Sequence, residues 1–360
     1  MSPNQGPSNE RRTSGHARLR GALAAALALA AVFLPGTRPA SVDAQDAAAG
    51  TVLRIACVAP RGSAWHRVFT AWGNSLREAT GGRLSITVHA GGASASERDF
   101  VNRIRANDLD GASLSALGFA ALGAEGTTER PLLVLQAPGL FTEYAPLDRA
   151  RTALDADLRT GLRAAGMELL GWSDLGRGRL FSTHPITTPT ELRAAHLWQP
   201  ADEPLSTATL AQLGNAHPVT LPLSGVGAAI ADHRVDTVVA SAMAASALGW
   251  TGQGRLTHVS SQPTSVLVGG TVIASADVAA LAPDLQEHLR RTGTQAHETL
   301  QRTLRRDDER AYETLTRQGL TPFTLAADAE WRTLATQTRE RLVTTHVLPR
   351  ALLDRAAATR

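Results

Sequence analysis

Four of the six tryptophans stand near the ends of predicted elements, where a side chain can face a ligand: Trp65, Trp172, Trp198 and Trp250. Concave small-molecule sites combine aromatic side chains with a few polar groups. Trp198 is the leading candidate because it ends a short predicted strand, Leu197–Trp198, and ligands of open α/β sheets bind beyond the carboxyl ends of strands. Trp72 and Trp331 lie in predicted helices and are expected to pack. Each tryptophan taken singly also fits a packing role, so the prediction depends on several meeting in one cleft.

Residue types that carry catalysis or hold metals show no suitable grouping in the sequence. The 11 histidines lack the spacing of metal ligands, and His288 and His297 lie too far apart for an H-E-x-x-H pair, on a helix expected to be exposed. No G-x-S-x-G motif is present, and Gly225–Ile230 begins like a dinucleotide motif but lacks its third glycine. None of the 36 basic residues is a lysine, which excludes a P-loop or Schiff-base lysine. The sequence therefore predicts a protein that is not an enzyme and uses no metal and no cofactor.

The first 44 residues have the layout of a secretory signal peptide. Four arginines between residues 11 and 20 precede an uncharged Ala/Leu-rich run, Gly21–Leu34, which is shorter than the ~20 residues that span a bilayer. An uncleaved anchor is the alternative. Removing this segment takes away five arginines and two acidic residues, so the 36 basic and 33 acidic residues become equal in number and no nucleic-acid partner is implied. We expect a mature protein in the periplasm.

The segment after the leader predicts alternating strands and helices. Val52–Ala59 is a continuous apolar run, typical of a strand buried on both faces, and its Cys57 is expected to be a core thiol. Ser63 can cap a helix whose apolar stripe begins at Trp65 and ends at Ala79.

Two further strands and one helix follow. Leu84–Val88 alternates apolar and polar residues, and Leu109–Leu114 is a short apolar run. Between them, Ser94 and Glu97 have the spacing of a capping box at a helix start. The resulting βαβαβ order predicts a parallel sheet with helices on both faces.

The later part of the chain predicts more strands and then long helices. Strands are expected at Met167–Trp172, Arg179–Ser182, Val235–Ala240 and Val266–Ala274, the first two joined by a glycine-rich turn. Pro283–Gly319 holds one apolar face and would form a helix roughly 54 Å long, more than one small lobe needs. A last helix is expected over Glu330–Leu348.

The length of the mature chain predicts two lobes, because a single hydrophobic core stops growing near this size. We expect residues 45–172 to form the first lobe together with part of the C-terminal segment. Residues 173–275 would form mostly the second lobe with hinge strands. Residues 276–360 would supply the long bracing helix and the C-terminal helices.

Segments spread along the chain resemble, in the same order, the DctP-type proteins, the extracytoplasmic solute-binding subunits of TRAP transporters. These segments are Leu53–His66, Thr80–Val88, Gly92–Phe100, Leu169–Asp174, Phe181–Pro189, Leu213–Val219 and Val235–Asp236. The resemblance implies an α/β, two-lobed periplasmic binding protein fold, each lobe a mixed sheet flanked by helices, with a long helix spanning both lobes. It also implies closure around one small molecule, commonly a carboxylate, by a hinge motion.

Trp198 stands where the family pattern has an arginine that clamps the ligand carboxylate. An indole cannot neutralise a carboxylate, so an uncharged, aromatic or lipid-like ligand is expected. A carboxylate ligand clamped by Arg179 or Arg177 from the neighbouring strand is the alternative.

The residues expected to contact the ligand are Trp65, His66, Ser115, Trp172, Arg179, Trp198, Ser241 and Met243. For His66, hydrogen bonding at a helix terminus is the alternative role. The expected partners are membrane transport subunits or, in a branch of the family with apolar clefts, a tetratricopeptide-repeat protein. A ligand-sensing module of a signalling system is a further alternative.

Overall fold

The structure is a computed structural model that describes residues 50–91, 96–123, 126–214, 216–252 and 255–360. The predicted signal peptide, residues 1–44, and Ser94 of the predicted capping box lie outside these residues. Among the described residues, no helix combines the length and the apolar character needed to cross a membrane.

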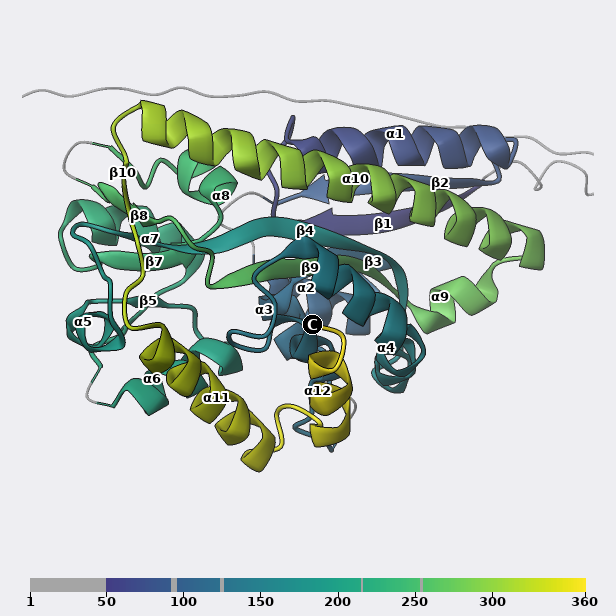
Figure 1. Ribbon diagram of the computed structural model, residues 1–360. Coiled ribbons are helices and arrows are strands. Elements are labelled where there is room, and N and C mark those ends of the chain that lie inside the picture. The colour runs from purple at the N-terminus through teal and green to yellow at the C-terminus, as the bar shows by residue number, and fades with distance from the viewer. Residues whose placement is uncertain (1–49, 92–95, 124–125, 215, 253–254) are drawn as a thin grey trace, which may run out of the picture. The chain divides into compact units, whose positions relative to one another are not determined.

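One mixed sheet connects the two lobes (Figure 1). Its strands are β1 (Thr51–Cys57), β2 (Leu84–Ala90), β3 (Gly111–Ser115), β4 (Met167–Ser182), β7 (Thr237–Ala240), β8 (His258–Ser260), β9 (Ser265–Ala274) and β10 (Thr321–Phe323). Their order is β10-β8-β4-β9-β3-β1-β2, and β7 also pairs with β4. β1 is parallel to β2 and β3, whereas β9 runs antiparallel to β3 and β4. The predicted class, a two-lobed α/β fold with mixed sheets, is confirmed, although the sheet is not purely parallel.

β4 corrects the prediction of two strands joined by a turn. It is a single strand of 16 residues that pairs with β9 from Met167 to Gly178 and then with β7. Its register shifts at two places, before Gly171 and before Gly176. Gly176 has a φ of 109°, a conformation that glycine adopts without strain, so the bulge is absorbed and the strand continues.

The helices near the N-terminus largely follow the predicted caps. α1 (Ala64–Ala79) begins after Ser63, whose Oγ accepts a hydrogen bond from the amide of His66. α2 (Glu97–Arg105) is capped by Ser96, so Glu97 is its first residue and not the third residue of a capping box. This difference frees the Glu97 carboxyl for contacts elsewhere.

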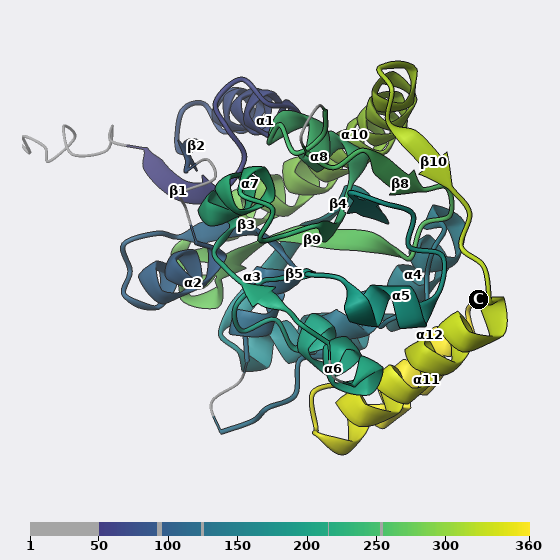
Figure 2. The ribbon, with the colours of Figure 1, turned by 90° about the vertical axis from the view of Figure 1, so that its left-hand side faces the viewer.

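α10 (Pro283–Arg317) is one helix of 35 residues and spans both lobes, as predicted. It lies with α1 on one face of the sheet, while α2, α3 (Ala116–Ala121) and α4 (Tyr144–Ala164) cover the other face (Figures 1 and 2). Leu289 and Leu300 of α10 pack with core residues of the first lobe, and Leu315 packs with core residues of the second. The helix therefore braces the two lobes.

The remaining elements are mostly short. They are η2 (Pro131–Gln136), α5 (Pro189–Ala194), β5 (Trp198–Gln199), α6 (Pro204–Leu213), β6 (Val219–Thr220), α7 (Leu223–Ala231), α8 (Ala242–Ala247), α9 (Ser275–Ala280), α11 (Asp328–Thr344) and α12 (Arg350–Ala357). β5 and β6 pair in parallel as a small separate sheet. α11 packs against α5 and α6, and α12 packs against α4 and η2. The predicted helix over Glu330–Leu348 thus corresponds to α11.

Candidate ligand-binding cavity

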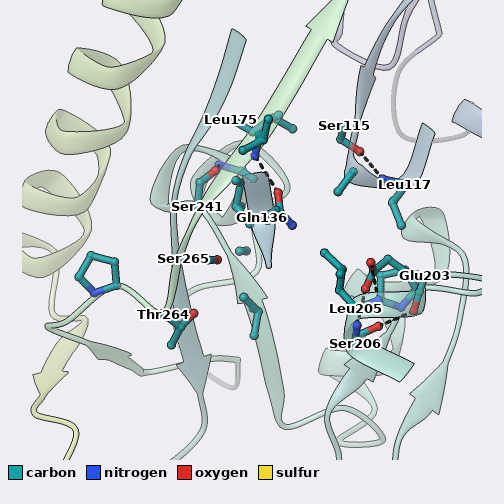
Figure 3. Close-up of a pocket in the computed structure, with 18 of the residues that line it drawn as sticks. Ser115, Leu117, Gln136, Leu175, Glu203, Leu205, Ser206, Ser241, Thr264 and Ser265 are labelled. Atoms are coloured by element: carbon teal, nitrogen blue, oxygen red, sulfur yellow. Dashed lines mark hydrogen bonds between the residues drawn. The ribbon is translucent and has the colours of Figure 1, made fainter. Parts of the chain in front are cut away.

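A cavity of about 950 Å³ lies between the lobes and is the candidate site. Its wall includes the ends of β1, β3 and β7, the paired strands β4 and β9, and helices α6, α8 and α11. Figure 3 shows Ser115, Leu117 and Glu203 on one side of the open space and Ser241, Thr264 and Ser265 on the other. The volume is at the upper end of the range typical of small-molecule pockets.

Five of the eight residues predicted to contact a ligand border this cavity. They are Trp65, Ser115, Trp198, Ser241 and Met243. Ser115 and Ser241 cap α3 and α8, so each hydroxyl stands where a strand passes into a helix. These five residues thus lie at one cavity, and their contact with a ligand stays a prediction.

Trp198 is held in a fixed orientation at the cavity wall. Its Nε1 donates a hydrogen bond of 3.0 Å to the carbonyl oxygen of Leu221. Its ring meets the ring of Trp250 edge-on, with centroids 5.7 Å apart, and Trp250 also borders the cavity. Because the indole N–H is already bonded, Trp198 presents an apolar surface to a ligand.

Arg179, Trp172 and His66 do not border the cavity. The Arg179 guanidinium is buried, donates to the carbonyl oxygens of Ser260 and Ser261, and lies 4.2 Å from the ring centroid of Tyr312. Burial lowers the pKa of Arg179. These contacts hold the guanidinium within the second lobe, away from the cavity.

Trp172 and Arg177 are also engaged away from the cavity. Trp172 packs edge-on against Phe119, with centroids 6.1 Å apart. Arg177 forms ion pairs with Glu143 at 2.8 Å and Glu309 at 2.9 Å. Neither arginine proposed for the alternative carboxylate clamp therefore faces the cavity.

Two buried carboxyl groups in the cavity wall were not predicted. Glu97 Oε2 accepts hydrogen bonds of 2.8 Å from the amide and hydroxyl of Ser115 and from the amide of Gly118. Glu203 caps α6 by accepting from the amides of Leu205 and Ser206. Burial raises the pKa of both carboxyls despite these bonds. The sequence Glu203-Pro204 was a usable signal, because an acidic residue before a proline at the first helical position is a helix start.

The basic side chains that border the cavity all lie in the C-terminal segment. They are Arg332, Arg339 and Arg360. Arg339 Nη1 donates to the carbonyl oxygen of Pro138 at 2.5 Å, which ties α11 to the first lobe. In the described part of the chain, the strands contribute no basic side chain to the cavity wall.

A two-lobed α/β protein whose lobes enclose a cavity with apolar, aromatic and hydroxyl side chains has the architecture of a small-molecule binding protein. The chain belongs to the DctP family, the bacterial extracellular solute-binding proteins of family 7, whose pattern matches residues 55–344. This is a family of solute-binding proteins and not of enzymes. No curated protein matches the chain significantly.

Several solved TRAP periplasmic solute-binding proteins share this fold. One from Roseobacter denitrificans, with bound β-D-glucuronate, is 16% identical, has a TM-score of 0.77 and covers 86% of this chain and 100% of its own. One from Ralstonia eutropha, with bound (S)-2-acetolactate, is 17% identical, has a TM-score of 0.75 and covers 86% and 98%. One from Shewanella oneidensis, with bound succinate, is 14% identical, has a TM-score of 0.74 and covers 86% and 99%. At these identities the likeness establishes the fold alone.

Proposed function

We propose that this protein captures one uncharged ligand, apolar, aromatic or lipid-like, between its lobes in the periplasm and delivers it to a TRAP-type transporter in the membrane. The observation that carries this proposal is Trp198, which borders the cavity where the resemblance places a carboxylate-clamping arginine. Its indole N–H is bonded to the backbone, so it offers neither charge nor a free donor.

The electrostatics of the cavity wall support the same proposal. Glu97 and Glu203 are both buried there, and a ligand carboxylate entering the cavity would meet these groups without a basic side chain from the strands. Burying an unpaired charge is strongly unfavourable. An uncharged ligand avoids this penalty.

A carboxylate ligand is the second candidate. Arg332, Arg339 and Arg360 border the cavity, and the relatives named above hold glucuronate and succinate. In this chain such a ligand would have to lie beside α11, which carries Arg332 and Arg339. Clamping by Arg179 or Arg177 is the weaker form of this candidate, because both guanidinium groups are bonded elsewhere.

Native mass spectrometry of the mature protein purified from its host tests the ligand class. A co-purifying uncharged apolar molecule supports the proposal. Tight calorimetric binding of a small dicarboxylate such as succinate contradicts it. For the partner, capture of membrane transport subunits supports delivery, whereas capture of a tetratricopeptide-repeat protein or of a sensor protein favours those alternatives.

Replacing Trp198 with arginine is expected to weaken binding of N-phenylnaphthylamine, an uncharged fluorescent probe, by about tenfold or more. The introduced guanidinium must lose water against an apolar ligand, and tenfold corresponds to about 1.4 kcal/mol. Fluorescence titration measures the change. The control Trp198→Phe keeps an apolar ring and is expected to bind the probe much as the wild type does. Equal affinity of W198R and wild type would mean that Trp198 is outside the binding site.

A further inference from the structure

One face of the paired strands β4 and β9 forms part of the cavity wall. Ser265, Leu267 and Gly269 alternate along β9 and therefore share one face. Across the ladder, Ser173 pairs with Gly269 and Gly178 pairs with Ser265. Ser173, Leu175, Leu267 and Ser265 all border the cavity. This face, which we call the hinge stripe, thus presents a hydroxyl, two leucines and a second hydroxyl in succession.

Each serine of the hinge stripe stands opposite a glycine. A Cβ atom on Gly269 would lie 3.0 Å from Ser173 Oγ and 2.7 Å from Leu175 Cδ1. A Cβ atom on Gly178 would lie 2.6 Å from Ser265 Oγ. A side chain at either glycine would collide with the hydroxyl opposite, so the two glycines leave the room that these hydroxyls occupy.

Ser173 differs from other hydroxyl side chains of the cavity wall in its hydrogen bonds. Ser115 donates to Glu97, Thr264 donates to the Gly178 carbonyl at 3.1 Å, and Ser206 donates to the Glu203 carbonyl at 3.2 Å. Ser173, in contrast, is 1% exposed, and its Oγ has no hydrogen-bond partner within the described ranges. Buried polar groups are nearly always bonded, so this hydroxyl at the cavity is available to a ligand group or a water molecule.

We propose that the ligand is elongated, with an apolar middle on Leu175 and Leu267 and an uncharged oxygen function, a hydroxyl or carbonyl, hydrogen-bonded to Ser173 Oγ. A second uncharged oxygen function lies toward Ser265. Gly269, the β9 partner of Ser173, lies four residues from Ser265 along the strand, which is a distance of about 13 Å. This inference rests on the proposed function and specifies its ligand class.

The charge of the hinge stripe selects the uncharged form of the ligand. Its four side chains are hydroxyls and leucines, and none carries a charge. A neutral hydroxyl supplies one hydrogen bond, which cannot replace the hydration that a carboxylate loses on burial. A neutral hydroxyl or carbonyl on the ligand loses far less and satisfies Ser173 completely.

The test compares two probes with a ten-carbon chain. Decanediol carries a hydroxyl at each end, and decanedioate carries a carboxylate at each end. Calorimetric titration of the mature protein, with tryptophan fluorescence as a second signal, is expected to show decanediol binding at least about tenfold more tightly. The variants Ser173→Ala and Ser265→Ala are each expected to weaken decanediol binding by about threefold to tenfold, the effect of one neutral hydrogen bond. Ser275→Ala is the matched control, because Ser275 Oγ is also buried without a partner in the described part of the chain but does not border the cavity.

The possible outcomes separate this inference from the proposed function. Weaker decanediol binding in S173A and unchanged binding in S275A support the inference. Equal decanediol binding in wild type, S173A and S265A overturns it and leaves the uncharged-ligand proposal intact. Tighter binding of decanedioate than of decanediol overturns both. Thermal unfolding of each variant confirms that a loss of binding is not a loss of folding.

Discussion

Replacing Asp174 with alanine is expected to lower the free energy of unfolding by about 3–5 kcal/mol. Asp174 is 0% exposed in β4 and forms ion pairs of 2.6 Å with Arg151 of α4 and with Arg305 of α10. Arg151 is itself buried, with a side-chain exposure of 5%. Removing the carboxylate leaves this guanidinium buried with only a longer pair, 3.5 Å to Asp148, and breaking one side of a buried ion pair is costly.

The position of Asp174 makes this loss relevant to binding. Arg305 also pairs with Asp148 of α4 at 2.6 Å, so the network joins the long helix, α4 and the strand that continues into the second lobe. Asp174 directly follows Ser173, a residue that borders the cavity. The ion pairs therefore support the geometry of the hinge stripe.

Urea unfolding followed by tryptophan fluorescence measures the effect. The control is Glu313→Ala, which removes an exposed pair with Arg317 on the same long helix, 3.8 Å apart and more than half exposed on both sides. Exposed pairs contribute about 0–1 kcal/mol, so this variant should unfold nearly as the wild type does. Similar losses in the two variants would show that burial of the Asp174 network has no energetic consequence.

Acidification from about pH 7 to pH 4 is expected to remove about 3 kcal/mol of stability through His297 alone. His297 lies in α10, is 2% exposed, and bonds to the Gly293 carbonyl and to Thr271 Oγ1, both at 2.7 Å. Burial lowers the pKa of His297 from 6.5 to about 4, because the charged imidazolium would lose its hydration. The aromatic rings of Phe69 and Trp72 lie against it.

The loss of stability on acidification follows from proton binding to His297. Between about pH 6.5 and pH 4 the unfolded chain protonates this imidazole and the folded protein does not, so the unfolded state gains stability as the pH falls. Above pH 6.5 both states are neutral and the effect vanishes. The measurement compares urea unfolding of wild type and His297→Gln across this range. The wild type should lose about 3 kcal/mol more than the variant, and parallel pH profiles would contradict the assignment.

Elements whose determinants are local could be predicted from the sequence. α1 follows from the Ser63 cap and the apolar stripe to Ala79, and α10 follows from its proline start and long apolar face. Both depend on contacts within a few residues of the chain. The resemblance to DctP proteins, now confirmed as family membership, implied the two-lobed fold and the long helix that spans both lobes.

Elements that depend on distant partners were predicted less well. Glycines interrupt the apolar pattern of β4, which suggested a turn, but β9 offers a continuous partner and the bulges let the strand pass. His297 was expected on an exposed long helix. It is buried because Gly171 leaves room for its ring, since a Cβ there would lie 2.3 Å from the imidazole, and no local pattern reveals that contact.

The sequence also predicted some residues of the cavity wall and misplaced others. Trp65, Ser115, Trp198, Ser241 and Met243 were predicted to contact the ligand, and the structure places all five at one cavity. Arg179 also lies near a strand end, yet its guanidinium turns to the Ser260 carbonyl and Tyr312. Sequence position says where a residue lies along a strand but not which partner its side chain meets.

The sequence by itself determined the family, the order of strands and helices, and the presence of a tryptophan where a charged clamp was expected. Only the tertiary structure decided which side chains face the cavity. That choice depends on cross-strand register and on helix packing between residues far apart in the chain, as in the pairing of Ser173 with Gly269. The register of a strand depends on its partner strand and on the core that the sheet covers. Neither can be predicted from the residues of one segment.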